Sequence, residues 1–231
     1  TRNNYTDGYF TERPRAERLT DYELGATYTA KNWHVGANLY WMDYKDQLVL
    51  TGELNEIGEA VSANVPKSYR AGIELQGGFS LPLGLSWEGN LTLSRNRIRD
   101  FKETIYGYDD DWNDLPAAVV DHGDTHIAFS PDIIAGSNLS YTYKGLRTSL
   151  HTQFVSEQYM SNADVAAHKL DAYCVSNLDV SYTFSPKSLA KNASIGVTVY
   201  NLFNEEYLSV LSRPMPGINF EIFIGITPKF K

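Results

Sequence analysis

Residues 32–44 read NWHVGANLYWMDY, and every second side chain from Trp33 to Trp41 is apolar. One side of an extended chain here would carry Trp33, Val35, Ala37, Leu39 and Trp41, and the other would carry His34, Asn38 and Tyr40. Because successive side chains of a β-strand point to opposite faces, this alternation predicts a strand with one apolar and one polar face.

The same two-residue period recurs along the chain, in about nine segments of roughly 10 residues each. The segments lie within residues 21–28, 33–41, 69–79, 85–93, 133–142, 146–154, 177–184, 194–199 and 219–226. A tilted strand of about 10 residues is long enough to cross a bilayer, whereas no run approaches the roughly 20 apolar residues of a spanning helix. The apolar sides of these segments contain no Arg or Lys, each of which would cost about 2 to 4 kcal/mol at mid-bilayer.

The connections between these segments alternate between short and long. Short ones lie at 30–32, 81–84, 144–145 and 185–192, and long ones at 46–67, 99–130, 160–172 and 205–217. In outer-membrane barrels, short turns face the periplasm and long loops face outside. The sequence therefore predicts an all-β fold, an antiparallel up-and-down transmembrane β-barrel, with residues 1–19 as the tail of another outside loop. Aromatic residues on the apolar sides, expected near strand ends as an interfacial girdle, are Trp33, Trp41, Tyr69, Phe79, Trp87, Phe184 and Phe230.

A soluble β-sandwich is the alternative fold, since its strands also alternate. Sandwich strands average about 5 to 6 residues, and such a fold has no reason to alternate short and long connections. The composition, with 16 Tyr, a net charge of −8 and a mean hydropathy of −0.35, fits a barrel and argues against a nucleic-acid partner. An odd number of strands cannot close an up-and-down barrel, so we expect further strands before Thr1.

Several stretches resemble the TonB-dependent outer-membrane receptor family. VTVYNLFNEEY at 197–207 is similar to the end of that family's penultimate strand, with Asn201, Leu202, Phe203, Asn204 and Tyr207 at the motif positions. RPMPGINFEIFIGITPKF at 213–230 resembles the family's last strand, and RPRAERLTDYELGATY at 13–28 and NVPKSYRAGIELQ at 64–76 resemble earlier ones.

The resemblance implies that residues 1–231 are about nine C-terminal strands of a barrel of about 22 strands, without its plug domain and earlier strands. It further implies a location in the bacterial outer membrane and import of a scarce nutrient, most often a ferric siderophore or similar iron complex. The implied partners are TonB, reached through an absent N-terminal box, outer-membrane lipid and an extracellular nutrient ligand. A passive porin-like channel, a non-transporting surface protein, and a cobalamin, haem or glycan receptor of the same family remain alternatives.

The longest connection contains the candidate ligand-binding residues. Tyr106, Tyr108 and Trp112 could stack on a flat or sugar-like ligand, and Asp109, Asp111 and Asn113 place oxygen ligands for calcium at alternate positions. The Gly and Glu of a calcium loop are absent, which favours a solvated acidic loop. His122, Asp124 and His126 could ligate a transition metal, but two loop histidines without a third fixed ligand favour solvent exposure. No other cofactor is expected.

Motifs of catalysis are missing from the sequence. There is no G-x-S-x-G, no H-E-x-x-H and no Gly-rich phosphate loop. Carboxylate pairs such as Glu205 and Glu206 lie in expected loops, where charge first serves solubility. We therefore expect a protein that is not an enzyme.

Overall fold

A computed structural model describes residues 5–6, 9–10, 14–54, 60–105, 109–111, 113, 115–116, 118–186, 190–210 and 213–228. The long strands are β3 (Arg18–Thr29), β4 (Trp33–Leu54), β5 (Ala60–Ser80), β6 (Leu85–Ile105), β7 (Ala118–His126), β8 (Ile133–Tyr143), β9 (Leu146–Val155), β12 (Tyr173–Phe184), β13 (Ala190–Tyr200) and β16 (Asn219–Pro228). Short elements are β1 (Tyr5–Thr6), β2 (Tyr9–Phe10), β10 (Gln158–Tyr159), β11 (Lys169–Leu170), β14 (Leu208–Val210), β15 (Arg213–Pro214) and the 3₁₀ turns η2 (Pro82–Gly84) and η3 (Ala166–His168). No helix in this described part of the chain is long and apolar enough to cross a membrane.

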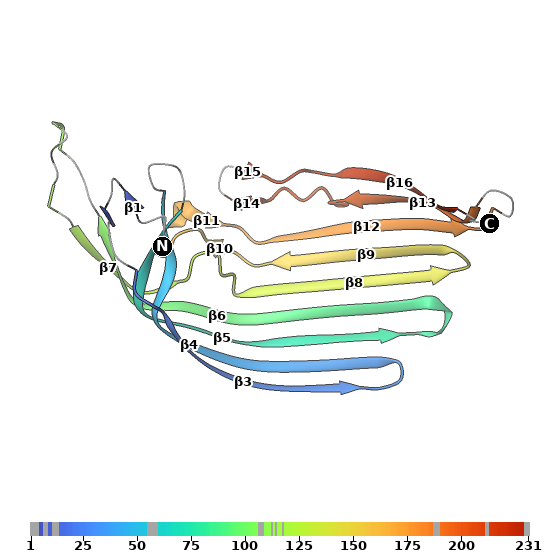
Figure 1. Ribbon diagram of the computed structural model, residues 1–231, viewed down its shortest axis with the longest axis horizontal. Helices are drawn as coiled ribbons and strands as arrows, with labels where there is room; N and C mark the ends of the chain where they lie inside the picture. Colours follow the sequence, from blue (N-terminus) through green and yellow to red (C-terminus); the bar gives the residue numbers. More distant parts are fainter. Residues whose placement is uncertain are drawn as a thin grey trace.

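The long strands form one antiparallel sheet of ten strands, in the order β16-β13-β12-β9-β8-β6-β5-β4-β3, with β7 paired to β6 (Figure 1). Apart from β7, each long strand pairs with the next long strand along the chain, as an up-and-down topology requires. Within the described residues the two edge strands, β3 and β16, do not pair, so the sheet is an open, partial barrel. The predicted fold class is therefore confirmed.

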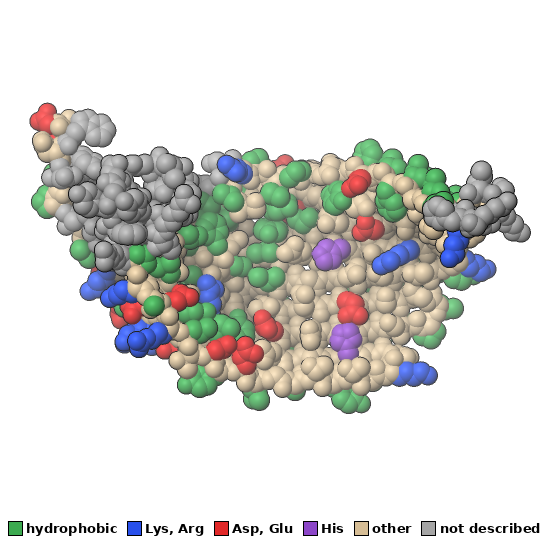
Figure 2. All heavy atoms as spheres, viewed as in Figure 1, with side chains coloured by type: hydrophobic (Ala, Val, Ile, Leu, Met, Phe, Trp, Pro, Cys, Tyr) green, Lys and Arg blue, Asp and Glu red, His purple; other side chains and the backbone are tan. Residues whose placement is uncertain are grey.

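The two faces of the sheet differ as the alternation predicts. Leu39 pairs with Leu24 on one side and with Ile73 on the other, so apolar residues lie next to apolar residues across strands. Leu24 and Leu39 are 73% and 51% exposed, which is expected for side chains that face lipid rather than a protein core. The opposite face is largely polar, with scattered acidic, basic and histidine side chains over the middle of the strands (Figure 2).

The short turns lie together at one end of the sheet (Figure 1). Between β8 and β9 the turn is Lys144–Gly145, with φ of +46° and +89°. Two successive positive φ values are the signature of a type I′ hairpin, whose twist matches that of paired strands. A side chain at Gly145 would also lie 2.4 Å from the carbonyl oxygen of Thr183, so glycine is required here on both counts.

At the opposite end the structure corrects the predicted connections. The stretches 46–67 and 99–130 were expected to be long loops, but β4, β5 and β6 continue into them and contain 22, 21 and 21 residues. Gln47 pairs with Val65, and Ile105 pairs with Ala118 of β7. Trp41 consequently lies within β4 rather than near its end. We call the part of β4–β7 beyond Trp41 the extracellular extension, because the long connections lie at this end.

Asp46 marks a change of face within β4. Trp41 and Val49 have the same parity, yet Trp41 is exposed on the apolar face, whereas Val49 packs with Ile98 in a buried cluster. Asp46 adopts a φ of +54°, a left-handed conformation that re-aims the side chains after it. Gln47 accordingly accepts a hydrogen bond of 2.5 Å from Ser68, which lies on the polar side of β5.

This change of face creates a small core in the extracellular extension. Val49, Val65, Ile98 and Ile127 are buried together, with Phe101 packed against them. Asn162, from the connection between β10 and β11, is 1% exposed; it donates to the carbonyl oxygen of Leu50 and accepts from the backbone N–H of Ala128. The extension is thus held by apolar packing and by hydrogen bonds between segments distant in sequence.

Candidate functional site

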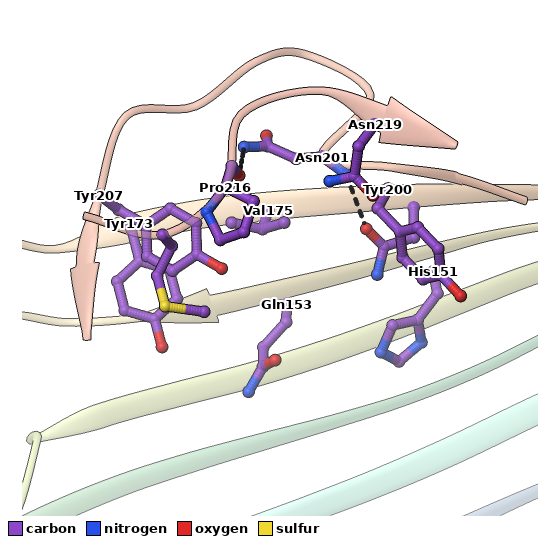
Figure 3. A pocket seen from close by; sticks show the side chains of 11 residues that line it. His151, Gln153, Tyr173, Val175, Tyr200, Asn201, Tyr207, Pro216 and Asn219 are labelled. Carbon is purple, nitrogen blue, oxygen red and sulfur yellow. Dashed lines mark hydrogen bonds between the residues drawn. The ribbon is translucent and has the colours of Figure 1, made fainter. Parts of the chain in front are cut away.

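A cavity of about 460 Å³ opens on the polar face near the extracellular end of β9, β12 and β13 (Figure 3). Its wall combines aromatic rings with amide and imidazole groups, from His151, Gln153, Tyr173, Val175, Asn177, Tyr200, Asn201, Tyr207, Met215, Pro216 and Asn219. Small-molecule sites combine apolar and aromatic side chains with placed polar groups, and this wall contains both kinds.

Strand register brings the floor of the cavity together. Asn177 pairs with His151, and Val175 pairs with Gln153, across β12 and β9. These residues share one parity in each strand, so their side chains project to the same polar face. The floor is therefore carried by rigid strands, and its side chains keep fixed spacing.

Two tyrosines form the outer part of the wall. Tyr173 begins β12, and Tyr207 lies in the connection that follows β13; their ring centroids are 4.4 Å apart with an interplanar angle of 30°. The backbone N–H of Met215 donates to the carbonyl oxygen of Tyr207 at 3.0 Å, which fixes the segment carrying that ring. The stacked pair presents an aromatic surface beside the polar floor.

Asn201 of the predicted motif braces this connection. Its backbone N–H donates to Oδ1 of Asn177 at 2.9 Å, and its Nδ2 donates to the carbonyl oxygens of Glu205 and Pro216 (Figure 3). Its Oδ1 accepts from the N–H of Glu205 at 2.8 Å. With 4% exposure, Asn201 uses its polar atoms to fold the chain back over the cavity.

The other motif residues have different surroundings. Asn204 adopts a φ of +53°, like Asn201 at +50°, and its Oδ1 accepts from the N–H of Ile218 at 2.9 Å. Asn tolerates this left-handed conformation better than most residues, which explains two Asn in one turn. The N–H of Leu202 donates to the carbonyl oxygen of Ser176, whereas Phe203 is 71% exposed. Of the five motif residues, Asn201 and Tyr207 line the cavity.

Sequence reasoning did not single out the cavity residues Tyr173, Val175 and Tyr200. All three lie on the polar parity of their strands, since they share it with Asn177 in β12 and with Thr198 in β13. The sequence signal that could have identified these three residues is an apolar or aromatic side chain on an otherwise polar face. His151 and Gln153 had no such signal, because polar residues fill that parity throughout the sheet.

The predicted ligand-binding aromatics, Tyr106, Tyr108 and Trp112, lie outside the described residues. Oδ1 of Asp109 accepts hydrogen bonds from the backbone N–H groups of Asp111 and Asn113, and both of its carboxylate oxygens accept from Asn113 Nδ2. The Asn113 side chain is the main cause that lowers the pKa of Asp109, with its backbone N–H contributing next. This turn gives the carboxylate a structural role, and calcium binding there stays a prediction.

The candidate transition-metal residues point to separate partners. Nε2 of His122 lies 2.9 Å from Glu103, and Nδ1 of His126 lies 2.8 Å from Asp164. Asp124 accepts a hydrogen bond from the backbone N–H of Asp100. Among the residues that the structure describes, no group of three or more His, Cys, Asp or Glu could hold a metal ion.

Solved structures of several uptake receptors and transporters share this fold. The ferric yersiniabactin uptake receptor FyuA from Yersinia pestis matches with a TM-score of 0.62 and 18% identity over 90% of this chain and 28% of its own. The siderophore receptor PiuA from Acinetobacter baumannii matches with a TM-score of 0.65 and 13% identity, over 89% of this chain and 28% of its own. The copper transporter OprC matches with a TM-score of 0.62 and 16% identity, over 94% of this chain and 32% of its own. The chain thus spans about a third or less of the length of these proteins. A comparison with curated protein sequences finds no match.

The family model "TonB dependent receptor-like, beta-barrel" matches residues 1–202. This match covers most of the chain, and it agrees with the open, up-and-down sheet and its two unlike faces. Proteins with these barrels are transport receptors of the outer membrane of Gram-negative bacteria rather than enzymes. The chain therefore belongs to the TonB-dependent receptor β-barrel family, and its place is in the outer membrane.

Proposed function

We propose that this chain is part of a receptor that imports a ferric siderophore or similar iron complex, and that the cavity of Tyr173 and Tyr207 is where its barrel wall contacts the ligand. The observation that carries the proposal is the position of the cavity, on the polar face and at the end of the sheet opposite the short turns. In a closed barrel this place is the lumen side of the extracellular mouth.

The chemistry of the wall suits a metal chelate. The stacked rings of Tyr173 and Tyr207 offer a flat apolar surface to an aromatic or heterocyclic ligand. Gln153 and Asn219 add amide donors for chelate oxygens, and His151 adds an imidazole. The structurally similar FyuA and PiuA are a ferric yersiniabactin uptake receptor and a siderophore receptor. Energy would come from TonB, through a box in the part of the receptor before this chain.

Uptake of radiolabelled iron chelates tests this function in the full-length receptor. A strain lacking its own siderophore receptors would express the protein with and without TonB. We expect uptake of at least one siderophore class, and we expect it only with TonB. Uptake that proceeds equally without TonB would indicate the porin-like alternative, and uptake of cobalamin, haem or a glycan alone would reassign the ligand.

Variants of the wall test the site separately. Tyr207→Ala removes one ring of the stacked pair, and we expect the full-length receptor to bind its chelate about 3- to 10-fold more weakly, the range of one aromatic contact. Gln153→Ala removes one amide, and Gln76→Ala, on the same face near the short-turn end, is its matched control. If Gln153→Ala and Tyr207→Ala bind the chelate as tightly as the control, the cavity is not the ligand site. That result would leave the proposal of iron-chelate import standing.

A further inference from the structure

Four basic residues lie side by side on neighbouring strands at the start of the extracellular extension. Arg18 of β3 pairs with Lys45 of β4, and Lys45 pairs with Lys67 of β5. Ser68 pairs with Ile98 of β6, which places Arg99 beside Lys67 at the next position. We call Arg18, Lys45, Lys67 and Arg99 the basic row. With strands about 4.8 Å apart, the row is roughly 14 Å wide.

The basic row lies on the apolar, lipid-facing side of the sheet. Lys45 precedes the change of face at Asp46 and shares its parity with Trp41. Trp41 stacks on Tyr69 at 5.2 Å, and the guanidinium carbon of Arg99 lies 5.0 Å from the centre of the same Tyr69 ring. The row therefore begins where the exposed apolar side chains end, next to aromatic residues of the kind that mark the edge of the hydrocarbon layer.

Within the part of the chain that the structure describes, these four cations have no acidic partners of their own. All four are exposed, and no carboxylate among the described residues lies within ion-pair distance of any of them. Arg97 in the same strand provides the contrast, because it forms a two-pronged pair with Asp132 at 3.0 and 3.1 Å. Asp43 is the acidic residue that precedes Lys45 on this face. Like charges directly opposite each other in a sheet are destabilising, so an external anion would stabilise the row.

We propose that the basic row binds the phosphate groups of phosphorylated lipid headgroups in the outer leaflet of the outer membrane. Lys and Arg are the side chains that bind phosphate, Arg through paired N–H groups and Lys as a point charge. The apolar band directly below the row requires lipid tails, so the anion closest to the row is the headgroup of the same lipid. The row is thus a lipid site on the outer wall, separate from the lumen cavity.

Binding of phosphorylated lipid A to the full-length receptor tests this site, with detergent-purified protein and native mass spectrometry. The variant Lys45→Gln/Lys67→Gln/Arg99→Gln removes three charges and leaves uncharged polar side chains in their place. We expect its apparent affinity to fall about 100-fold, or about five-fold for each cation, the factor typical of a Lys or Arg at an anionic membrane surface. Lys45→Arg/Lys67→Arg should retain the affinity of the wild type.

The matched control is Lys31→Gln/Lys144→Gln/Lys191→Gln, which removes three cations near the short-turn end. A heat-shifted band on gel electrophoresis verifies that each variant has folded as a barrel. The proposal is overturned if the first variant keeps wild-type affinity, or if the control loses as much. The proposal is also overturned if the wild-type receptor binds dephosphorylated lipid A as tightly as phosphorylated lipid A. Displacement of the lipid by an equal concentration of inorganic phosphate would overturn it too, because the site would then select a soluble anion.

Discussion

The membrane-facing part of the sheet and the extracellular extension bury their apolar residues in opposite ways. Leu24 and Ile224, in the first part, are 73% and 72% exposed on the apolar face. In the extension, Ile98 is 0% exposed and Val65 is 4% exposed, although both belong to strands that continue from the same sheet. The membrane-facing part needs surrounding lipid to remove its apolar surface from water, whereas the extracellular extension buries its apolar side chains against one another.

The comparison teaches that strand length alone does not locate the membrane. β4 contains 22 residues, about twice what a tilted strand needs to cross a bilayer. The apolar band on it runs from Trp33 to Trp41, roughly 26 Å at 3.3 Å per residue. The remaining residues of β4 belong to the extension, where a hydrogen bond from Asn162 to Leu50 and packing on Ile98 replace lipid contacts.

The largest effect is expected when the core of the extension is opened. Ile98→Ala removes a fully buried side chain, and we expect the extension to lose about 2 to 5 kcal/mol against local unfolding because a cavity is left. Hydrogen exchange of the full-length receptor would measure this as faster exchange in β4–β7 beyond Trp41, with the membrane-facing strands unchanged. Ile224→Ala, on the lipid-facing side of β16, is the control and should leave exchange in the extension unaltered. Faster exchange throughout the sheet would contradict the division into two regions.

A charge placed on the lipid-facing side tests the other region. Leu39→Arg should cost about 2 to 4 kcal/mol, because the guanidinium would lie in hydrocarbon. Asn38→Arg places the same side chain one residue away on the polar face, opposite Glu74, and should cost little. Unfolding of the full-length receptor from lipid vesicles by denaturant measures both. Equal losses for the two variants would mean that the faces are not divided between lipid and lumen.

The smallest effect concerns the turn at Asp109, at the far tip of the extension. Hydrogen bonds from Asn113 lower the pKa of Asp109 below its usual value of about 3.9. The turn is therefore stabilised above about pH 3.9, and this contribution is lost as the pH falls through the lowered pKa. The carboxyl chemical shift of labelled Asp109 should give a titration midpoint below that of a free Asp side chain, and this midpoint should move up in Asn113→Ala. An unchanged midpoint in that variant would assign the lowered pKa to another cause.

Much of the fold could be predicted from the sequence, because a two-residue period is a local property. Alternation from Trp33 to Trp41 and the turn at Lys144–Gly145 each depend on a few adjacent residues, and both predictions are confirmed. The extension could not be predicted in the same way. Its core joins Val49 to Ile127, far apart in the chain, and the change of face at Asp46 interrupts the period that reveals a strand.

The candidate site was predictable only in part. The family motif includes Asn201 and Tyr207, which line the cavity, although the resemblance assigned neither of them to a ligand site. Gln153 and His151 could not be distinguished from other polar residues on the same face, since only the register of β9 with β12 brings them under the aromatic pair. The two-residue alternation predicts on which face of the sheet a residue lies, but it does not predict which residues are its neighbours on the adjacent strands.

The left-handed residue at Asp46 limits how this chain can change in length. At Asp46 the face on which alternate side chains of β4 lie changes once. Deleting a single residue between Asp46 and Val49 would therefore turn Val49 out of the core, while the apolar side chains up to Trp41 would still face lipid. Tolerated length changes in this hairpin should therefore come in pairs, or beyond the last core contact. Among relatives, the length of the β4–β5 hairpin beyond the core can thus vary more readily than the choice of which side chains face the core.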